Sequence, residues 1–132
     1  TINSFATVSL DPPLILWSVT RTSCSAPAFL EAEHFAVNIL SQRQTALCKA
    51  FARSGPDKFV DVDCESGLGD APVLAGALAT LECRTVKQVD GGDHVVLFGQ
   101  VERMRSAPGT PLLFVGGRFA MPADLPSVGQ EA

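Results

Sequence analysis

The stretch Thr1-Ile-Asn-Ser-Phe-Ala-Thr-Val-Ser-Leu-Asp-Pro-Pro13 opens the chain with polar and apolar side chains interleaved. On an extended backbone, such side chains separate into hydrogen-bonding groups and apolar anchors beneath them. The hydrogen-bonding residues are Asn3, Ser4, Thr7 and Ser9, and the apolar ones are Ile2, Phe5, Val8 and Leu10. A binding site with apolar walls and a few fixed hydrogen-bond donors suits a planar ligand that carries heteroatoms along its edge. Asp11-Pro-Pro13 predicts a strand-ending turn, because proline cannot donate to a central ladder.

The rest of the chain predicts a β-rich domain with one or two helices. Apolar or alternating runs indicate strands at residues 13–20, 35–40, 74–89, 94–103 and 112–119. A short helix is predicted from Ser25, which caps a first turn containing proline, and a longer one from Ser41, where Ser-x-x-Gln forms a capping box. Residues 64–72 form a glycine-rich loop, and residues 90–93 a turn. Many uneven strands with few helices fit an antiparallel barrel.

Composition narrows the class of protein. The 132 residues are 46% hydrophobic, which is enough for the core of one domain. A net charge of −4 disfavours nucleic acid as a partner. The sequence has no run of 18 apolar residues, so it predicts no membrane span. Cys24, Cys48, Cys64 and Cys83 form no Cys-x-x-Cys pair, which disfavours a zinc or dithiol site. We expect reduced thiols in a cytoplasmic protein and no bound metal, with a disulfide as the less favoured alternative.

Short motifs spread along the chain carry a family resemblance. The opening block is followed by Ala36-Val-Asn-Ile-Leu-Ser-Gln42 and Gly92-Asp-His94. Four further motifs lie in register with these blocks: Asp57-Lys-Phe59, Gly67-x-x-x-x-Pro72, Leu81-Glu-Cys83 and Pro111-Leu-Leu-Phe114. Together these blocks resemble the flavin reductase-like family, whose fold is an FMN-binding split β-barrel. The resemblance runs from residue 1 to about residue 119.

The resemblance implies a fold, a domain organisation and an activity. The fold is a mainly β, antiparallel split barrel, formed by a single domain over residues 1–132 that lacks the family's N-terminal helix and first strand. The activity is that of an NAD(P)H-dependent flavin reductase, in which NADH or NADPH passes hydride to FMN or FAD. A homodimer and a separate monooxygenase that receives the reduced flavin are implied as partners. Two alternatives stay open: a non-catalytic flavin-binding or electron-carrier protein, and an inactive fragment.

The resemblance also selects candidate flavin-binding residues. They are Thr1, Asn3, Ser4, Thr7, Ser9, Asn38, Leu40, Ser41, Gln42, Lys58 and Phe59. In the family, positions matching Thr1, Asn3 and Ser4 meet the ring edge and ribityl chain. From the residues themselves, a helix starting at Ser41 offers free N–H groups and a positive dipole end to a phosphate. Each residue also has an ordinary alternative: a helix cap at Ser41, a buried amide at Asn38, and surface or core positions at Lys58 and Phe59.

His94 is the candidate catalytic residue. The family places the histidine of Gly-Asp-His beside the nicotinamide side of the flavin, where it positions the nicotinamide or meets its phosphates. Judged on its neighbours alone, a histidine after Gly-Gly-Asp is a turn residue. His34 has no such motif, and we expect it to be structural. The chain has no Gly-x-Gly-x-x-Gly or Walker sequence, which disfavours a Rossmann dehydrogenase.

Overall fold

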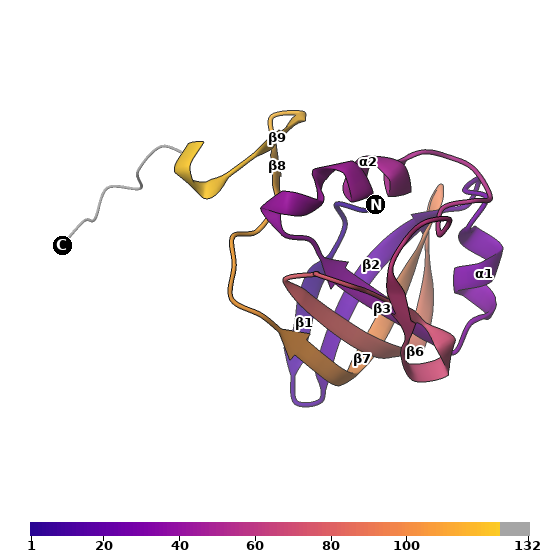
Figure 1. The fold of residues 1–132 in the computed structure, drawn as a ribbon. Helices are drawn as coiled ribbons and strands as arrows, with labels where there is room; N and C mark the ends of the chain where they lie inside the picture. Colours follow the sequence, from indigo (N-terminus) through magenta and orange to yellow (C-terminus); the bar gives the residue numbers. More distant parts are fainter. Residues whose placement is uncertain (125–132) are drawn as a thin grey trace.

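The computed structural model describes residues 1–124 and places them in a mainly β fold with two short α-helices (Figure 1). A five-stranded antiparallel sheet has the order β1-β2-β7-β6-β3. Its strands are β1 (Ala6–Leu10), β2 (Pro13–Thr20), β7 (His94–Ser106), β6 (Ala79–Gly91) and β3 (His34–Ile39). Among the described residues no strand pair joins β1 to β3, so these two form the sheet edges. The predicted mainly β, antiparallel architecture is confirmed.

Smaller elements surround this sheet. Two hairpins pair β4 (Cys64–Ser66) with β5 (Pro72–Leu74) and β8 (Leu113–Val115) with β9 (Arg118–Ala120). The helices are α1 (Ala26–Glu31) and α2 (Thr45–Ala52), with 3₁₀ turns η1 (Gln42–Gln44), η2 (Leu68–Asp70) and η3 (Pro122–Asp124). Figure 1 shows α2 lying across the top of the sheet with the N-terminus just below it, while β8 and β9 project away. No helix among residues 1–124 is both long and apolar enough to cross a membrane.

The core lies between the central strands and α1. The apolar run of β2 alternates, so Ile15, Trp17 and Val19 are buried and the residues between them are half-buried. The Trp17 ring packs edge-on against Phe29 of α1 at 4.8 Å and Phe35 of β3 at 5.8 Å, measured between ring centroids. These aromatic contacts join the helix to the sheet.

Two helix predictions need correction. Ser25 precedes α1, but its side chain makes no capping bond, and the proline in the first turn marks the start of this helix. α2 begins at Thr45 rather than near Ser41, because the Ser41–Gln44 capping box closes the separate turn η1 first. There the Ser41 N–H donates to Gln44 Oε1 at 3.0 Å.

Glycines divide two predicted segments. The apolar run 112–119 forms a hairpin because Gly116 and Gly117 adopt φ of 60° and 80°, which L side chains rarely take. Likewise Gly76, with φ of 74°, separates β5 from β6 within the predicted strand 74–89. The predicted loop 64–72 contains β4, η2 and the first residue of β5. The tail after Met121 was expected to pack loosely or to meet a partner, and residues 125–132 of it lie outside the described residues.

The N-terminal block differs most from expectation. Strand β1 starts only at Ala6, and the apolar residues expected to anchor it are exposed. Leu10 is 96% exposed and Val8 46% exposed. The prediction of buried anchors was wrong because β1 is an edge strand, and none of the described residues covers its outer surface.

A buried carboxylate ties a loop to the sheet. Glu82 of β6 has no solvent exposure, and its Oε1 accepts the Leu68 N–H at 2.8 Å. Its Oε2 lies 2.9 Å from Arg103 Nε and 3.7 Å from an Arg105 nitrogen, both on β7. These contacts hold η2 against the β6–β7 pair.

All four cysteines are unpaired in the structure. Cys83 is fully buried beside Glu82. Burial, followed by the charges of Glu102 and Glu82, raises the pKa of the Cys83 thiol to about 12. This thiol is therefore protonated at neutral pH and packs as a small apolar side chain.

Gly99 of β7 provides a test of the core. An added Cβ would lie 2.4 Å from Phe35 Cζ and 2.9 Å from Cys83 Cβ. We expect Gly99→Ala to lower the free energy of unfolding by about 1–3 kcal/mol, the usual cost of overpacking. The control is Gly91→Ala, whose nearest added contact is an ordinary 3.4 Å. Urea denaturation followed by Trp17 fluorescence measures both variants. Equal midpoints for the two variants would contradict the close approach at Gly99.

Candidate functional site

Residues from separate motifs meet at the C-terminal end of α2. The Thr1 hydroxyl donates to the Cys48 carbonyl at 2.9 Å, and Lys58 Nζ donates to the Phe51 carbonyl at 3.0 Å. The Phe59 ring lies edge-on to the Phe51 ring at 5.0 Å. A helix leaves its last carbonyls without intrahelical partners, and Lys58 satisfies that of Phe51. Thr1 of the opening block and Lys58 of Asp57-Lys-Phe59 therefore lie at the same end of this helix.

A pocket adjoins this end of α2. Its volume is about 370 Å³, and its lining residues are Cys24, Ser25, Gly55, Pro56, Lys58 and Phe59. Phe59 remains 47% exposed and supplies an aromatic wall, while Lys58 and Ser25 supply a cation and a hydroxyl. The volume lies in the range of small-molecule sites, roughly 300–1,000 Å³. This donor set fits a heterocyclic ring that carries a phosphate-bearing chain.

The other end of α2 differs from the predicted phosphate seat. The Ser41 N–H is bonded to Gln44 Oε1, the Gln42 N–H to the Thr110 carbonyl at 2.9 Å, and the Gln44 N–H to the Ser41 carbonyl at 2.9 Å. Leu40 is engaged too, since its carbonyl accepts the Leu112 N–H at 3.0 Å. The N–H groups of Ser41, Gln42 and Gln44 are therefore not free for an anion, contrary to our expectation. Ser41 and Gln42 would therefore contact an anion through their side chains.

The Asn38 side chain makes hydrogen bonds within the protein. Its Nδ2 donates to the Pro72 carbonyl at 3.1 Å. Its Oδ1 accepts from the Leu74 N–H at 3.0 Å and from the Thr80 hydroxyl at 3.1 Å. The amide thus holds β5 against β3 and β6, which is the ordinary alternative for a buried asparagine. Contact between Asn38 and a ligand stays a prediction.

The remaining residues of the opening block lie along β2. The Ser4 hydroxyl accepts the Ser18 N–H at 2.9 Å and donates to the Ser18 carbonyl at 3.3 Å. Asn3 and Thr7 are exposed, and Ser9 is half-buried beyond a register shift in β1. Ser4 therefore positions the N-terminal segment, whereas Asn3 and Thr7 face solvent.

His94 opens β7 at the tip of the long β6–β7 hairpin. Its Nδ1 lies 2.7 Å from Asp93 Oδ1, and its Nε2 lies 3.1 Å from the Thr20 hydroxyl. The hydrogen bond with His94, followed by the imidazole's charge, lowers the pKa of the Asp93 carboxyl. Sequence analysis did not find Thr20, because its only signal is the register that places it opposite His94. His34, which we expected to be structural, lies 3.7 Å from Glu102 and packs under Gly69.

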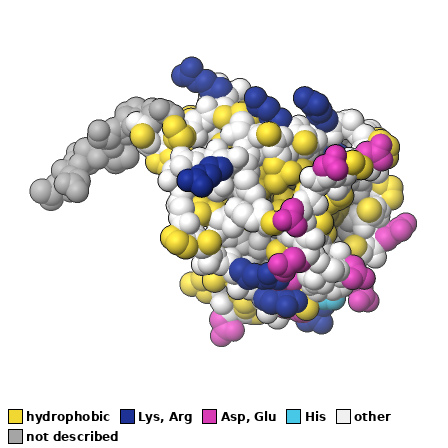
Figure 2. Space-filling view, viewed as in Figure 1, with side chains coloured by type: hydrophobic (Ala, Val, Ile, Leu, Met, Phe, Trp, Pro, Cys, Tyr) yellow, Lys and Arg dark blue, Asp and Glu magenta, His cyan; other side chains and the backbone are white. Residues whose placement is uncertain are grey.

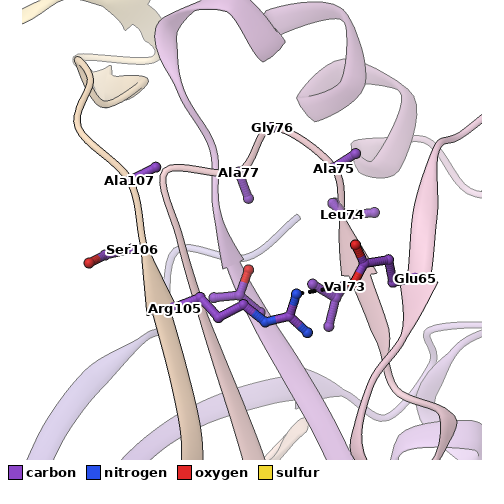
Figure 3. A pocket seen from close by; sticks show the side chains of 10 residues that line it. Glu65, Val73, Leu74, Ala75, Gly76, Ala77, Arg105, Ser106 and Ala107 are labelled. Atoms are coloured by element: carbon purple, nitrogen blue, oxygen red, sulfur yellow. Dashed lines mark hydrogen bonds and ion pairs between the residues drawn. The ribbon is translucent and has the colours of Figure 1, made fainter.

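A second, smaller hollow lies between the β4–β5 hairpin and the end of β7 (Figure 3). Its volume is about 190 Å³, and Arg105 and Glu65 point toward each other across it, 3.0 Å apart. Arg105 also lies near buried Glu82. A guanidinium between two carboxylates is already neutralised and does not provide an anion site. No group of three or more potential metal ligands occurs within residues 1–124.

Charge is spread over the surface. On the face seen in Figure 2, the lysine and arginine side chains near the top stand apart, whereas several near the bottom lie next to one another with acidic side chains beside them. An anionic ligand that binds the upper part of this face therefore meets individual cations rather than a continuous basic field.

Comparison with known proteins places this geometry in a family. A model described as "Flavin reductase like domain" matches residues 1–122. The FMN reductase (NADH) SmoA of Agrobacterium fabrum is 48% identical over 119 residues, which cover 90% of this chain and 68% of that protein. The reductase component of the flavin-dependent trigonelline monooxygenase of Acinetobacter baylyi is 40% identical over 123 residues. That match covers 93% of this chain but 40% of the relative, so the chain spans less than half of it.

A solved structure has the same fold. The NADH:FAD oxidoreductase SgcE6 of Streptomyces globisporus, in complex with NAD and FAD fragments, superposes with a TM-score of 0.85 and 37% identity. The superposition covers 90% of this chain and 73% of that one. The family model and the sequence relatives agree with this structural match, and the chain belongs to the flavin reductase-like domain family.

Proposed function

We propose that this chain is an NAD(P)H-dependent flavin reductase. The pocket at the C-terminal end of α2 carries the proposal, because the opening block and Asp57-Lys-Phe59 meet beside it. Support also comes from the relatives, which include an FMN reductase (NADH) and an NADH:FAD oxidoreductase. FMN or FAD is the proposed flavin, and NADH or NADPH the proposed reductant.

The chain's residues would bind and orient the two nucleotides. When bound, the flavin supplies the redox chemistry, accepting a hydride from the reduced nicotinamide. Phe59 offers a flat apolar face, and Lys58 an ammonium for phosphate. At the other end of α2, Ser41 and Gln42 offer a hydroxyl and an amide beside the charge of Arg43. Hydride transfer requires no proton donor from the protein, so these residues act through position and exclusion of water.

We further propose that the reduced flavin serves a separate monooxygenase in the cytoplasm. The trigonelline relative is named as the reductase component of such an enzyme. Four unpaired cysteines support a reducing compartment.

The activity is tested by anaerobic stopped-flow mixing of protein and FMN with NADH or NADPH. Fast, saturable loss of the oxidised-flavin absorbance above the free-flavin background is the expected result. Flavin binding without this loss would favour the electron-carrier alternative. Absence of binding would contradict both.

Ser41→Ala tests the proposed contact at the start of η1. We expect flavin affinity to fall by roughly 1 kcal/mol or more, the scale of one lost charge-assisted bond. The matched control is Gln44→Ala, which breaks the same capping box and the bond from Gln44 Nε2 to the Ala75 carbonyl. Flavin titration of both variants separates the two roles. An equal loss in both would mean that Ser41 shapes the turn rather than touching the flavin.

The homodimer is also a proposal, and β1 is the surface that supports it. This edge strand exposes Leu10 and Val8 together with an unpaired backbone edge, which natural proteins rarely leave uncovered. We expect Leu10→Lys to shift a dimer toward monomer in sedimentation experiments while leaving the unfolding midpoint of the monomer unchanged. Met104→Lys, at another exposed apolar side chain, is the control. A wild-type monomer, or equal dissociation by both variants, would contradict the assignment to β1.

A further inference from the structure

His94 has a protein partner at each ring nitrogen. Asp93 Oδ1 lies 2.7 Å from Nδ1, and Thr20 Oγ1 lies 3.1 Å from Nε2. The imidazole is nevertheless 41% exposed. Both polar atoms of the ring are therefore occupied, and what it presents to solvent is its carbon edge and face.

These two contacts select one tautomer of the neutral ring. A carboxylate accepts hydrogen bonds but does not donate them, so Nδ1 must carry the proton toward Asp93. The Asp93 carboxyl is ionised at neutral pH, in keeping with its lowered pKa. Nε2 is then the acceptor, and the Thr20 hydroxyl is its donor.

The surrounding backbone keeps the partners in place. Thr20 and His94 are directly opposite each other in the β2–β7 register. The next residue, Arg21, donates its N–H to the Asp93 carbonyl at 2.9 Å and its Nε to the Gly92 carbonyl at 3.0 Å. The Arg21 guanidinium also pairs with Asp90. These bonds tie the hairpin tip to the end of β2 and keep the backbones of Thr20 and Asp93 beside His94.

We propose that Thr20 is a positioning residue: Asp93 sets the Nδ1–H tautomer of His94, and Thr20 holds Nε2, which leaves the carbon face of the ring, not a nitrogen, for the nicotinamide. This inference rests on the proposed function and on the role that the family resemblance implies for His94, which is to position the reduced nicotinamide. It narrows that role, because a ring held in this way neither donates a proton during hydride transfer nor binds a phosphate. A phosphate would have to displace Thr20 from Nε2.

The tautomer is measured without any activity. The chain has two histidines, so long-range ¹H–¹⁵N correlation spectra at mildly alkaline pH contain two imidazoles, and a His34→Gln variant assigns them. We expect a protonated Nδ1 and an unprotonated Nε2 for His94. Asp93→Ala, which removes the acceptor at Nδ1, should produce a tautomer mixture. Thr20→Val, which keeps the branched shape but removes the hydroxyl, should shift the Nε2 resonance because that nitrogen loses its hydrogen-bond donor, whereas Thr20→Ser should retain the wild-type spectrum. A wild-type proton on Nε2, or an unchanged spectrum in Thr20→Val, would overturn the proposal.

Kinetics test the consequence for the reaction. We expect Thr20→Val to raise the KM for the nicotinamide about five-fold, the effect of one lost hydrogen bond, with kcat and flavin affinity little changed. Thr20→Ser should restore the wild-type KM. An active enzyme whose KM does not respond to Thr20→Val would overturn the positioning role. A wild-type protein that does not oxidise the nicotinamide would instead refute the proposed function, and the spectra would still report the Thr20–His94 bond.

Discussion

The buried carboxylate of Glu82 is the constraint around which this side of the fold is arranged. A charge without solvent must be surrounded by donors and cations, and removing one partner leaves the others uncompensated. Glu82 meets this requirement with Arg103 and Arg105 on one side and the Leu68 N–H on the other. The loop has to approach closely, and a Cβ at Gly67 would lie only 2.4 Å from the carboxylate. The path of residues 64–74 therefore follows from one polar group in β6.

The position of α2 depends on the same segment. Asn38 binds the backbone of Pro72 and Leu74, and Gln44 Nε2 reaches the Ala75 carbonyl at 2.9 Å. The turn before α2 is thus attached to the chain that Glu82 and Asn38 hold. Once the start of this short helix is fixed, so is its end, where Thr1 and Lys58 donate to backbone carbonyls. Polar contacts away from the pocket thus help to place the helix beside which the pocket lies.

Sequence patterns succeeded where the cause of structure is local. The bounds of β2 were predicted because prolines precede an apolar run that ends in polar residues. The break at Gly116 was missed although its signal is local, since a Gly-Gly pair between two short apolar runs is typical of a hairpin turn. The exposure of Leu10 and the pairing of Thr20 with His94 depend on which strands become neighbours. Strand order and register are properties of the whole sheet, and they could not be deduced from the residue pattern of this one sequence.

The candidate site residues come from several separate segments of the chain, which explains why no single motif identifies the site. A dinucleotide fingerprint concentrates its phosphate donors in one glycine-rich turn. In this chain, by contrast, the N–H groups around η1 are bonded to Gln44, Thr110 and Ser41. In the proposed function, side chains contribute to holding an anion at this end of α2, and residues from two further segments hold a ring at the other end. Each block is weak evidence because it supplies only one or two contacts. Their common order along the chain is informative because this fold brings separate blocks together, as it does for Thr1 and Lys58 at the end of α2.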